Sequence, residues 1–152
     1  MTVDFSKLGK TTMGELKPPP VSPEGSYVGV IRSWKWAESR WKNKETGQTE
    51  AQVHFTIKPT GFADGERDKV VDDSLREGIK FDGVITAEQG IQSDAQVYYM
   101  QEFLRGLGVN VTGRNLDECL PDAIGAQIKY DLVVKDGERG PIANVRRLRA
   151  AD

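Results

Sequence analysis

The chain has 152 residues, 38% of them hydrophobic and 29% charged, and a net charge of −2 at neutral pH. These values are typical of one water-soluble domain with a hydrophobic core, and they exclude both a chain that is disordered throughout and two domains of ordinary size. Because no apolar run approaches the ~18 residues of a membrane span and residues 1–23 lack the apolar segment of a secretory signal, we expect a cytoplasmic protein without membrane contact.

The first segment, residues 1–23, mixes polar side chains with three consecutive prolines at positions 18–20. Such a composition continues neither a helix nor a central strand. We therefore predict a flexible arm over 1–23 and a single folded domain over 24–150.

The domain opens with a predicted strand at 26–36, which is rich in Tyr, Val, Ile and Trp. Plain alternation places Trp34 and Trp36 on the face opposite Ile31. Gly29 permits a bulge that would exchange the two faces.

Two further strands follow. Residues 50–59 alternate the apolar Val53, Phe55 and Ile57 with polar side chains, which predicts a strand with one dry and one wet face. After an acidic loop over 61–77, the segment 78–85 predicts a third strand.

One helix and a hairpin complete the domain. Ser93 and Gln96 form a capping-box pattern, and apolar residues at intervals of three and four continue to Leu107. Residues 115–120 predict a further short helical turn. The segments 126–134 and 142–150 then predict two strands joined by a turn.

The predicted order is three strands, a helix and two strands, in a mainly β domain. A five-stranded barrel with the helix at one open end would give every apolar face a partner, and this order is the one used by the oligonucleotide-binding (OB) fold. A flat sheet with the helix across one face is the competing architecture.

Charge is unevenly distributed along the chain. Residues 32–58 carry six Lys/Arg against three Asp/Glu, residues 129–149 also carry six against three, and residues 61–124 carry six against thirteen. The loops that would flank the ligand in such a barrel, 38–48 and 135–141, fall in the two basic segments. Since salt screens charge beyond ~8 Å, a phosphate strand would sense these segments rather than the net charge. Ordinary solvated surface is the alternative interpretation.

Aromatic and basic side chains in these segments are what unpaired nucleic acid requires, because bases stack on rings and cations hold the phosphates. The candidate DNA-binding residues are Trp34, Trp36, Arg40, Trp41, Lys42, Lys44, His54, Lys58, Lys135 and Arg139.

Structural interpretations compete with several of these assignments. Trp34 and Trp36 also fit a strand core, and His54 also fits an ordinary polar face. The arginines of the last strand, Arg146, Arg147 and Arg149, either keep that strand soluble or bind phosphates.

Other chemistry has little support. One histidine and one cysteine, Cys119, cannot supply the roughly four N or S ligands of a structural zinc site, and no phosphate-binding glycine pattern is present. The carboxylates over 64–73 lack the spacing of an EF-hand. We expect no metal, no cofactor, no catalytic residue and hence no enzyme.

Four segments resemble bacteriophage single-stranded DNA-binding proteins with an OB fold: the start PEGSYVGVIRSWKWAES, the acidic middle, the helix QVYYMQEFLRGLGVNV and the closing IGAQIKYDLVVKDGERGPIANVRRLR. The similarity extends over about residues 23–149. It implies binding of single-stranded DNA with little sequence preference in DNA replication, recombination or repair, in the host cytoplasm if the protein is viral. Phage or host replication and recombination proteins are the further partners that it implies.

The chain departs from bacterial single-stranded DNA-binding proteins at its end. It closes on RRLRAAD, whereas those proteins end in an acidic tail with a terminal Phe. Tail-mediated recruitment and a tetramer are therefore not implied, and the oligomeric state stays open. The alternative function is a non-catalytic β-barrel module for protein interaction or virion structure, with the tryptophans in a subunit interface.

Overall fold

The computed structural model describes residues 23–63, 81, 83–138 and 140–151. Nearly all of the predicted arm at 1–23 lies outside these residues. The strands are β1 (Gly25–Glu38), β2 (Ala51–Phe62), β3 (Ile85–Gly90), β4 (Gln127–Gly137) and β5 (Gly140–Ala150), and between β3 and β4 lie α3 (Asp94–Gly106), α4 (Leu116–Cys119) and the short 3-10 helix η1 (Leu120–Ala123). In this part of the chain, no helix has the length and apolar character needed to cross a membrane.

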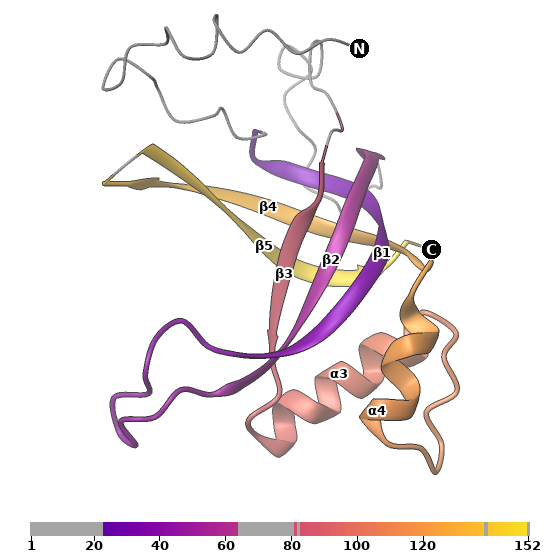
Figure 1. The fold of residues 1–152 in the computed structure, drawn as a ribbon. Coiled ribbons are helices and arrows are strands. Elements are labelled where there is room, and N and C mark those ends of the chain that lie inside the picture. The colour runs from indigo at the N-terminus through magenta and orange to yellow at the C-terminus, as the bar shows by residue number, and fades with distance from the viewer. Residues whose placement is uncertain (1–22, 64–80, 82, 139, 152) are drawn as a thin grey trace, which may run out of the picture.

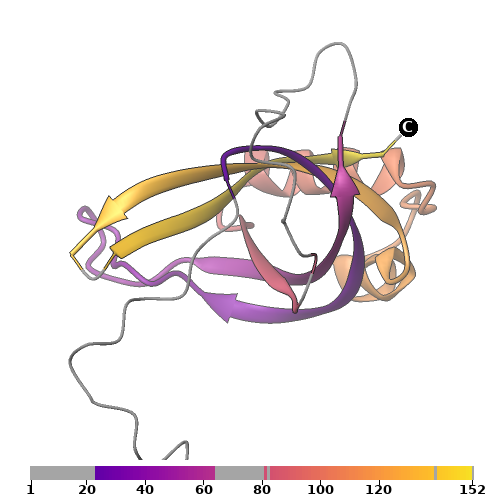
Figure 2. The ribbon, with the colours of Figure 1, turned by 90° about the horizontal axis from the view of Figure 1, so that it is seen from above.

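All five strands belong to one antiparallel sheet in the order β3-β2-β1-β4-β5. The sheet is strongly curved, so that its edge strands β3 and β5 approach each other (Figures 1 and 2). No ladder of hydrogen bonds joins β3 to β5 in the described residues. The mainly β domain with a five-stranded sheet is thus confirmed, whereas a closed ring of paired strands is not seen.

The core lies on the inner face of this curved sheet. As the alternation of β2 predicted, Val53, Phe55 and Ile57 are fully buried. Tyr27 of β1 and Tyr130 of β4 stack with ring centroids 5.6 Å apart. The ring of Phe55 meets Phe103 of α3 edge-on at 5.9 Å, and α3 lies next to the edge strands β3 and β5.

A bulge at Arg32 changes the predicted faces of β1. Ile31 pairs with Ile57 but Ser33 pairs with Thr56, which leaves Arg32 as an extra residue. The alternation is reset, and Trp34 and Trp36 lie on the same face as Ile31 rather than on the opposite one. The bulge was expected at Gly29, and a register shift is present there too, but the second shift decides the orientation of the tryptophans.

The third strand is later in the sequence than predicted. It occupies Ile85–Gly90, whereas the prediction placed it over 78–85. Of that segment, residues 78–80 and 82 lie outside the described residues, and Phe81 is not in a strand. The ring of Phe81 nevertheless packs against Phe62 at 5.2 Å, so its apolar character serves the core.

The remaining elements agree with the sequence. Ser93 accepts a hydrogen bond from the backbone N–H of Gln96, whose side chain accepts one from the N–H of Ser93, and α3 begins at this capping box as predicted. The short helical turn at 115–120 corresponds to α4, and the closing hairpin is formed by β4 and β5.

A buried carboxylate joins the first strand to the last. Asp131 of β4 accepts hydrogen bonds from the hydroxyl of Ser26 at 2.7 Å and from Nη1 of Arg147 at 2.8 Å, and Nη1 of Arg149 lies 3.3 Å away. Asp131 is almost inaccessible to solvent, and a charge in such a place is tolerated only when it is paired. The cluster therefore fastens β5 to the sheet beside a bulge between Lys129 and Asp131.

We expect Asp131→Ala to lower the free energy of unfolding by about 2 kcal/mol, less than for a fully buried pair because its arginine partners are partly exposed. Urea unfolding measures the loss. The matched control is Asp136→Ala, an exposed carboxylate on the same strand, for which we expect a change within about 0.5 kcal/mol. Equal effects of the two substitutions would contradict the assigned role.

Alkaline pH should lower the stability of the protein through its two core tyrosines. Burial raises the pKa of Tyr27 from 10.0 to about 12 and also raises the pKa of Tyr130. Because the folded state keeps protons that the unfolded chain releases, this stabilisation is complete below pH 10 and is lost as the pH rises towards 12. For Tyr27, the loss at pH 11 is about 1 kcal/mol. Urea unfolding at pH 8 and pH 11 should show a smaller difference in Tyr27→Phe than in the wild type, and equal differences would refute the assignment.

Candidate nucleic-acid interface

The β1–β2 hairpin projects from the sheet and carries an exposed loop. Beyond Val30, β1 no longer pairs with β4, and only β2 accompanies it to the loop 39–50. Figure 1 shows this loop extending well away from the helices. The loop is held by its own hydrogen bonds: the side-chain oxygen of Asn43 accepts from the N–H of Glu45 at 2.8 Å, and Ser39 donates to the carbonyl of Trp41 at 2.7 Å. Its shape is therefore set before any ligand arrives.

Trp41 is the most exposed large apolar residue in the described part of the chain, with 83% of its surface accessible. Lys42 and Lys44, which follow it in the loop, are exposed as well. An indole ring kept in water beside cations contributes nothing to the core, and exposed aromatic rings beside cations are the combination that single-stranded nucleic acids require.

Arg40 at the base of the loop is held by an acidic partner. Its Nη2 lies 2.8 Å and its Nε 2.9 Å from Oε1 of Glu88 on β3. The pair is largely exposed, so its contribution to stability is small. Glu88 therefore offsets part of the positive charge that Arg40 brings to the base of the loop.

The outer face of β2 carries a polar row. His54 lies between Lys35 of β1 and Glu88 of β3 in the register of the sheet. Its Nε2 is 2.8 Å from the side-chain oxygen of Gln52. Further along, the ammonium of Lys58 donates to the carbonyl of Phe81 at 2.5 Å. His54 and Lys35 thus face outwards, whereas Lys58 is already engaged by the backbone.

Trp34 and Trp36 lie on the other face of the sheet from His54. They pair with Phe55 and Val53, whose side chains are buried, and their rings meet edge-on at 5.3 Å. Trp34 packs against the core, and Trp36 remains 47% exposed. The structure therefore divides the predicted set: His54 lies on the outer face, whereas Trp34 and Trp36 lie on the opposite face, where Trp34 packs against the core.

The second basic segment is divided between the β4–β5 tip and the body of β5. In Figure 1 the tip of the β4–β5 hairpin lies at the upper left and the loop 39–50 at the lower left, so the two turns are well separated. Lys135 is exposed near that tip, and Arg139 lies outside the described residues. Nearer the sheet, Arg146 of β5 and Arg40 line one hollow of about 160 Å³, together with Glu88. One residue of each basic segment, Arg40 and Arg146, therefore lies at this hollow, whereas the two turns themselves do not come together.

The candidate residues from the sequence did not include three residues of this surface: Lys35, Glu88 and Arg146, for which phosphate binding was one of two open interpretations. For Lys35, the signal was its alternation with Trp34 and Trp36, once the bulge at Arg32 is known. For Glu88 and Arg146, which become neighbours only because β3 and β5 approach, no local signal exists.

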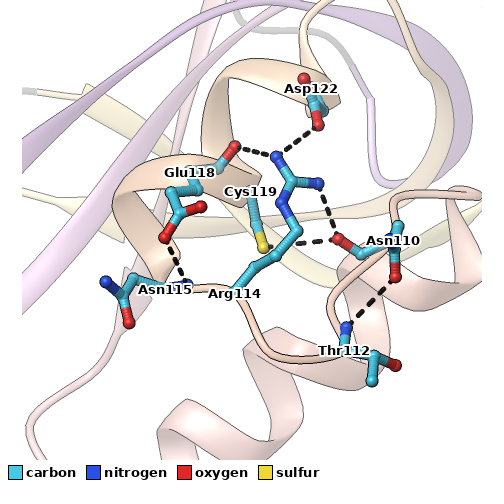
Figure 3. Close-up of polar contacts among 7 residues, drawn as sticks. All are labelled: Asn110, Thr112, Arg114, Asn115, Glu118, Cys119 and Asp122. Atoms are coloured by element: carbon cyan, nitrogen blue, oxygen red, sulfur yellow. Dashed lines mark hydrogen bonds and ion pairs between the residues drawn. The ribbon is translucent and has the colours of Figure 1, made fainter.

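Cys119 belongs to a structural cluster and not to this surface. Arg114 donates to the carbonyls of Asn110 and Glu118, each at 2.7 Å, and lies 2.9 Å from Asp122, which raises the pKa of its guanidinium through their hydrogen bond (Figure 3). These contacts tie the loop after α3 to α4. The thiol of Cys119 is buried beneath them, 3.7 Å from the carbonyl oxygen of Asn110.

Among the described residues, no three His, Cys, Asp or Glu side chains gather in a way that could hold a metal ion. The carboxylates at 64–73, the only segment that the sequence offered for a cation, lie outside those residues.

Comparison with known proteins identifies no relative. No protein-family model matches the chain, and no curated protein matches it. A function for the chain is therefore inferred from the geometry and charge of one surface. It consists of the loop 39–50, the outer face of β2 and the β3–β5 seam, by which we mean the line along which the edge strands β3 and β5 approach each other.

Proposed function

We propose that this protein binds single-stranded DNA without sequence preference and has no catalytic activity of its own. The observation that carries the proposal is the loop 39–50, which holds Trp41 in water between Arg40 and two exposed lysines. Stacking of one base on an aromatic ring contributes roughly 1–3 kcal/mol whatever the base, and nearby cations hold the phosphates. Such contacts bind a single strand of DNA whatever its sequence.

The strand order supports the OB fold as the architecture of this surface. The three strands, helix and two strands follow the OB order, and the two strands that would close such a barrel, β3 and β5, are the ones that approach each other. We assign the sheet to a partly open barrel of this type. In that fold the ligand crosses strands two and three between the first and last loops, which here are the loop 39–50 and the β4–β5 tip.

Charge distribution supports the same role despite the net charge of −2. Five basic residues lie on or beside the proposed path: Lys35, Arg40, Lys42, Lys44 and Arg146. Four acidic residues lie in the same region, Glu88 on β3 and Glu38, Glu45 and Glu50 in or next to the loop. Because salt screens charges beyond ~8 Å, the acidic residues of the helical region contribute little to the electrostatic energy of single-stranded DNA in that path. We place the function in DNA replication, recombination or repair, with proteins of those processes as further partners.

Trp41→Ala tests the stacking. Titration of the wild type with oligothymidine should quench tryptophan emission, and the affinity should fall steeply as salt is added. Trp41→Ala should lower the affinity, measured by anisotropy of a labelled oligothymidine, by about fivefold to a hundredfold. Ile124→Ala, which removes another exposed apolar side chain outside the path, should leave it unchanged.

The same experiment separates the rival function. A protein-interaction or virion-structural module also explains an exposed Trp41, as a subunit contact. A salt-insensitive oligomer that dissociates on Trp41→Ala, with no binding of oligothymidine, would favour that rival and exclude our proposal; light scattering measures the oligomer.

Glu88→Gln tests the competition for Arg40. Removing the carboxylate releases a guanidinium into the path, so we expect tighter binding of oligothymidine, by about twofold to fivefold, and a steeper dependence on salt. Arg40→Gln should weaken binding, and Glu88→Gln in the Arg40→Gln background should have a smaller effect than in the wild type. Weaker binding by Glu88→Gln would show that the carboxylate supports the ligand and does not compete with it.

A further inference from the structure

A second hollow lies beyond the first one along the β3–β5 seam. Thr86 and Glu88 of β3 line the first hollow, and Gln89 and Gly90 of the same strand line the second. On β5, the lining passes in the same way from residues 143–146 to residues 147–148. The two hollows therefore follow one another along two edge strands that no ladder joins in the described residues. The first hollow adjoins Glu88, which pairs with outward-facing His54, and the second adjoins Gln89, which pairs with buried Val53, so a ligand that reaches both passes through the gap between β3 and β5.

The second hollow has the size and the lining of a binding site. Its volume is about 320 Å³, at the lower end of the roughly 300–1,000 Å³ found for ligand sites. Apolar surface comes from Met100 and Phe103 of α3 and from Leu148 of β5, and amide groups come from Gln89 and Gln96. Such a lining accepts a flat, partly polar ring.

Tyr99 of α3 stands at this hollow with 70% of its surface exposed. Its neighbour Tyr98 is 56% exposed and touches it edge-on, with ring centroids 5.8 Å apart, but does not line the hollow. A phenol ring left in water at the mouth of a hollow offers a stacking surface, as Trp41 does at the other end of the path.

Arg147 supplies a cation at the same place. Its Nη1 is bonded to Asp131 at 2.8 Å, and more than half of the side chain remains exposed. A guanidinium has further N–H donors, so this tether fixes its position without exhausting its capacity to bind an anion. The residues that line the two hollows include three arginines and one acidic residue. The arginines are Arg40, Arg146 and Arg147, and the acidic residue is Glu88.

From this arrangement we infer that the path of single-stranded DNA continues along the β3–β5 seam into the second hollow, where a base stacks on Tyr99 and Arg147 contacts the adjoining phosphate. This inference rests on the proposed function and extends it, because it gives the path a second stacking residue, on a helix. Short strands would occupy only the end at Trp41, and longer strands would occupy both ends. Glu102, one turn beyond Tyr99, does not oppose it strongly, since Arg105 lies 3.4 Å from its carboxylate.

Tyr99→Ala tests the inference, with Tyr98→Ala as the matched control on the same helix. The probes are two oligothymidines whose lengths lie near the ends of the range of about 4–16 nucleotides bound per OB fold. We expect Tyr99→Ala to weaken binding of the long probe by about fivefold to a hundredfold and to leave the short probe unchanged. Tyr98→Ala should change neither, and Tyr99→Phe should restore the wild-type affinity because it keeps the ring.

Photocrosslinking gives an independent readout. A long oligothymidine containing 5-iododeoxyuridine should crosslink to Tyr99 in the wild-type protein, and mass spectrometry of the digested adduct identifies the residue. Circular dichroism checks that the variants are folded, which their exposure leads us to expect.

The outcomes distinguish the two proposals. If Trp41→Ala weakens both probes while Tyr99→Ala behaves like Tyr98→Ala, the extended path is wrong and the proposed function stands. If the wild-type protein binds neither probe, both proposals are wrong.

Discussion

At Gly29 the backbone of β1 lies so close to its neighbours that a Cβ atom would sit 2.7 Å from Cγ2 of Ile57 and 2.9 Å from the carbonyl oxygen of Lys58. No other residue fits without moving β2, because one of the two clashes is with the backbone. This close approach falls where β1 pairs with β2 on one side and with β4 on the other. The close approach holds β1 tightly against β2 at the point where β1 also pairs with β4, next to a register shift between Val28 and Gly29.

The course of β1 beyond this point decides where the proposed interface lies. Immediately after it, β1 leaves β4, and the N–H and carbonyl of Ile31 bond instead to Ala126 and Gly125 in the chain entering β4. The remainder of β1 is free to continue with β2 alone as the hairpin that carries the loop 39–50. The curvature of the sheet brings the edge strands β3 and β5 together, and with them Arg40 and Arg146. The hairpin and the approach of β3 to β5 are therefore both features of the same curved sheet.

How much the sequence predicts depends on whether the signal is local. The capping box of Ser93 and the alternation around Phe55 are complete within a few residues, and both predictions are confirmed. The faces of Trp34 and Trp36 could not be predicted, because a bulge at Arg32 leaves no mark in the composition of a strand. The third strand was predicted at the wrong position because the sequence of β3, ITAEQG, buries only Ala87 and has almost no apolar alternation. The candidate loop was found from its own residues, whereas the seam required the fold.

The seam also shows how the stability of the fold and the placement of a cation are coupled. Arg147 has a φ of 50°, a left-handed conformation that costs a residue with a side chain about 1–2 kcal/mol. Such a conformation persists only where its surroundings determine it, and here the hydrogen bond to buried Asp131 does so. Because the guanidinium is fixed by a carboxylate that the core itself needs paired, the hollow beside α3 keeps its positive charge whether or not an anion is bound. A cation that is placed in advance loses little conformational entropy on binding, so within the proposed path Arg147 would hold a phosphate at a smaller entropic cost than the exposed Lys42 and Lys44 of the loop.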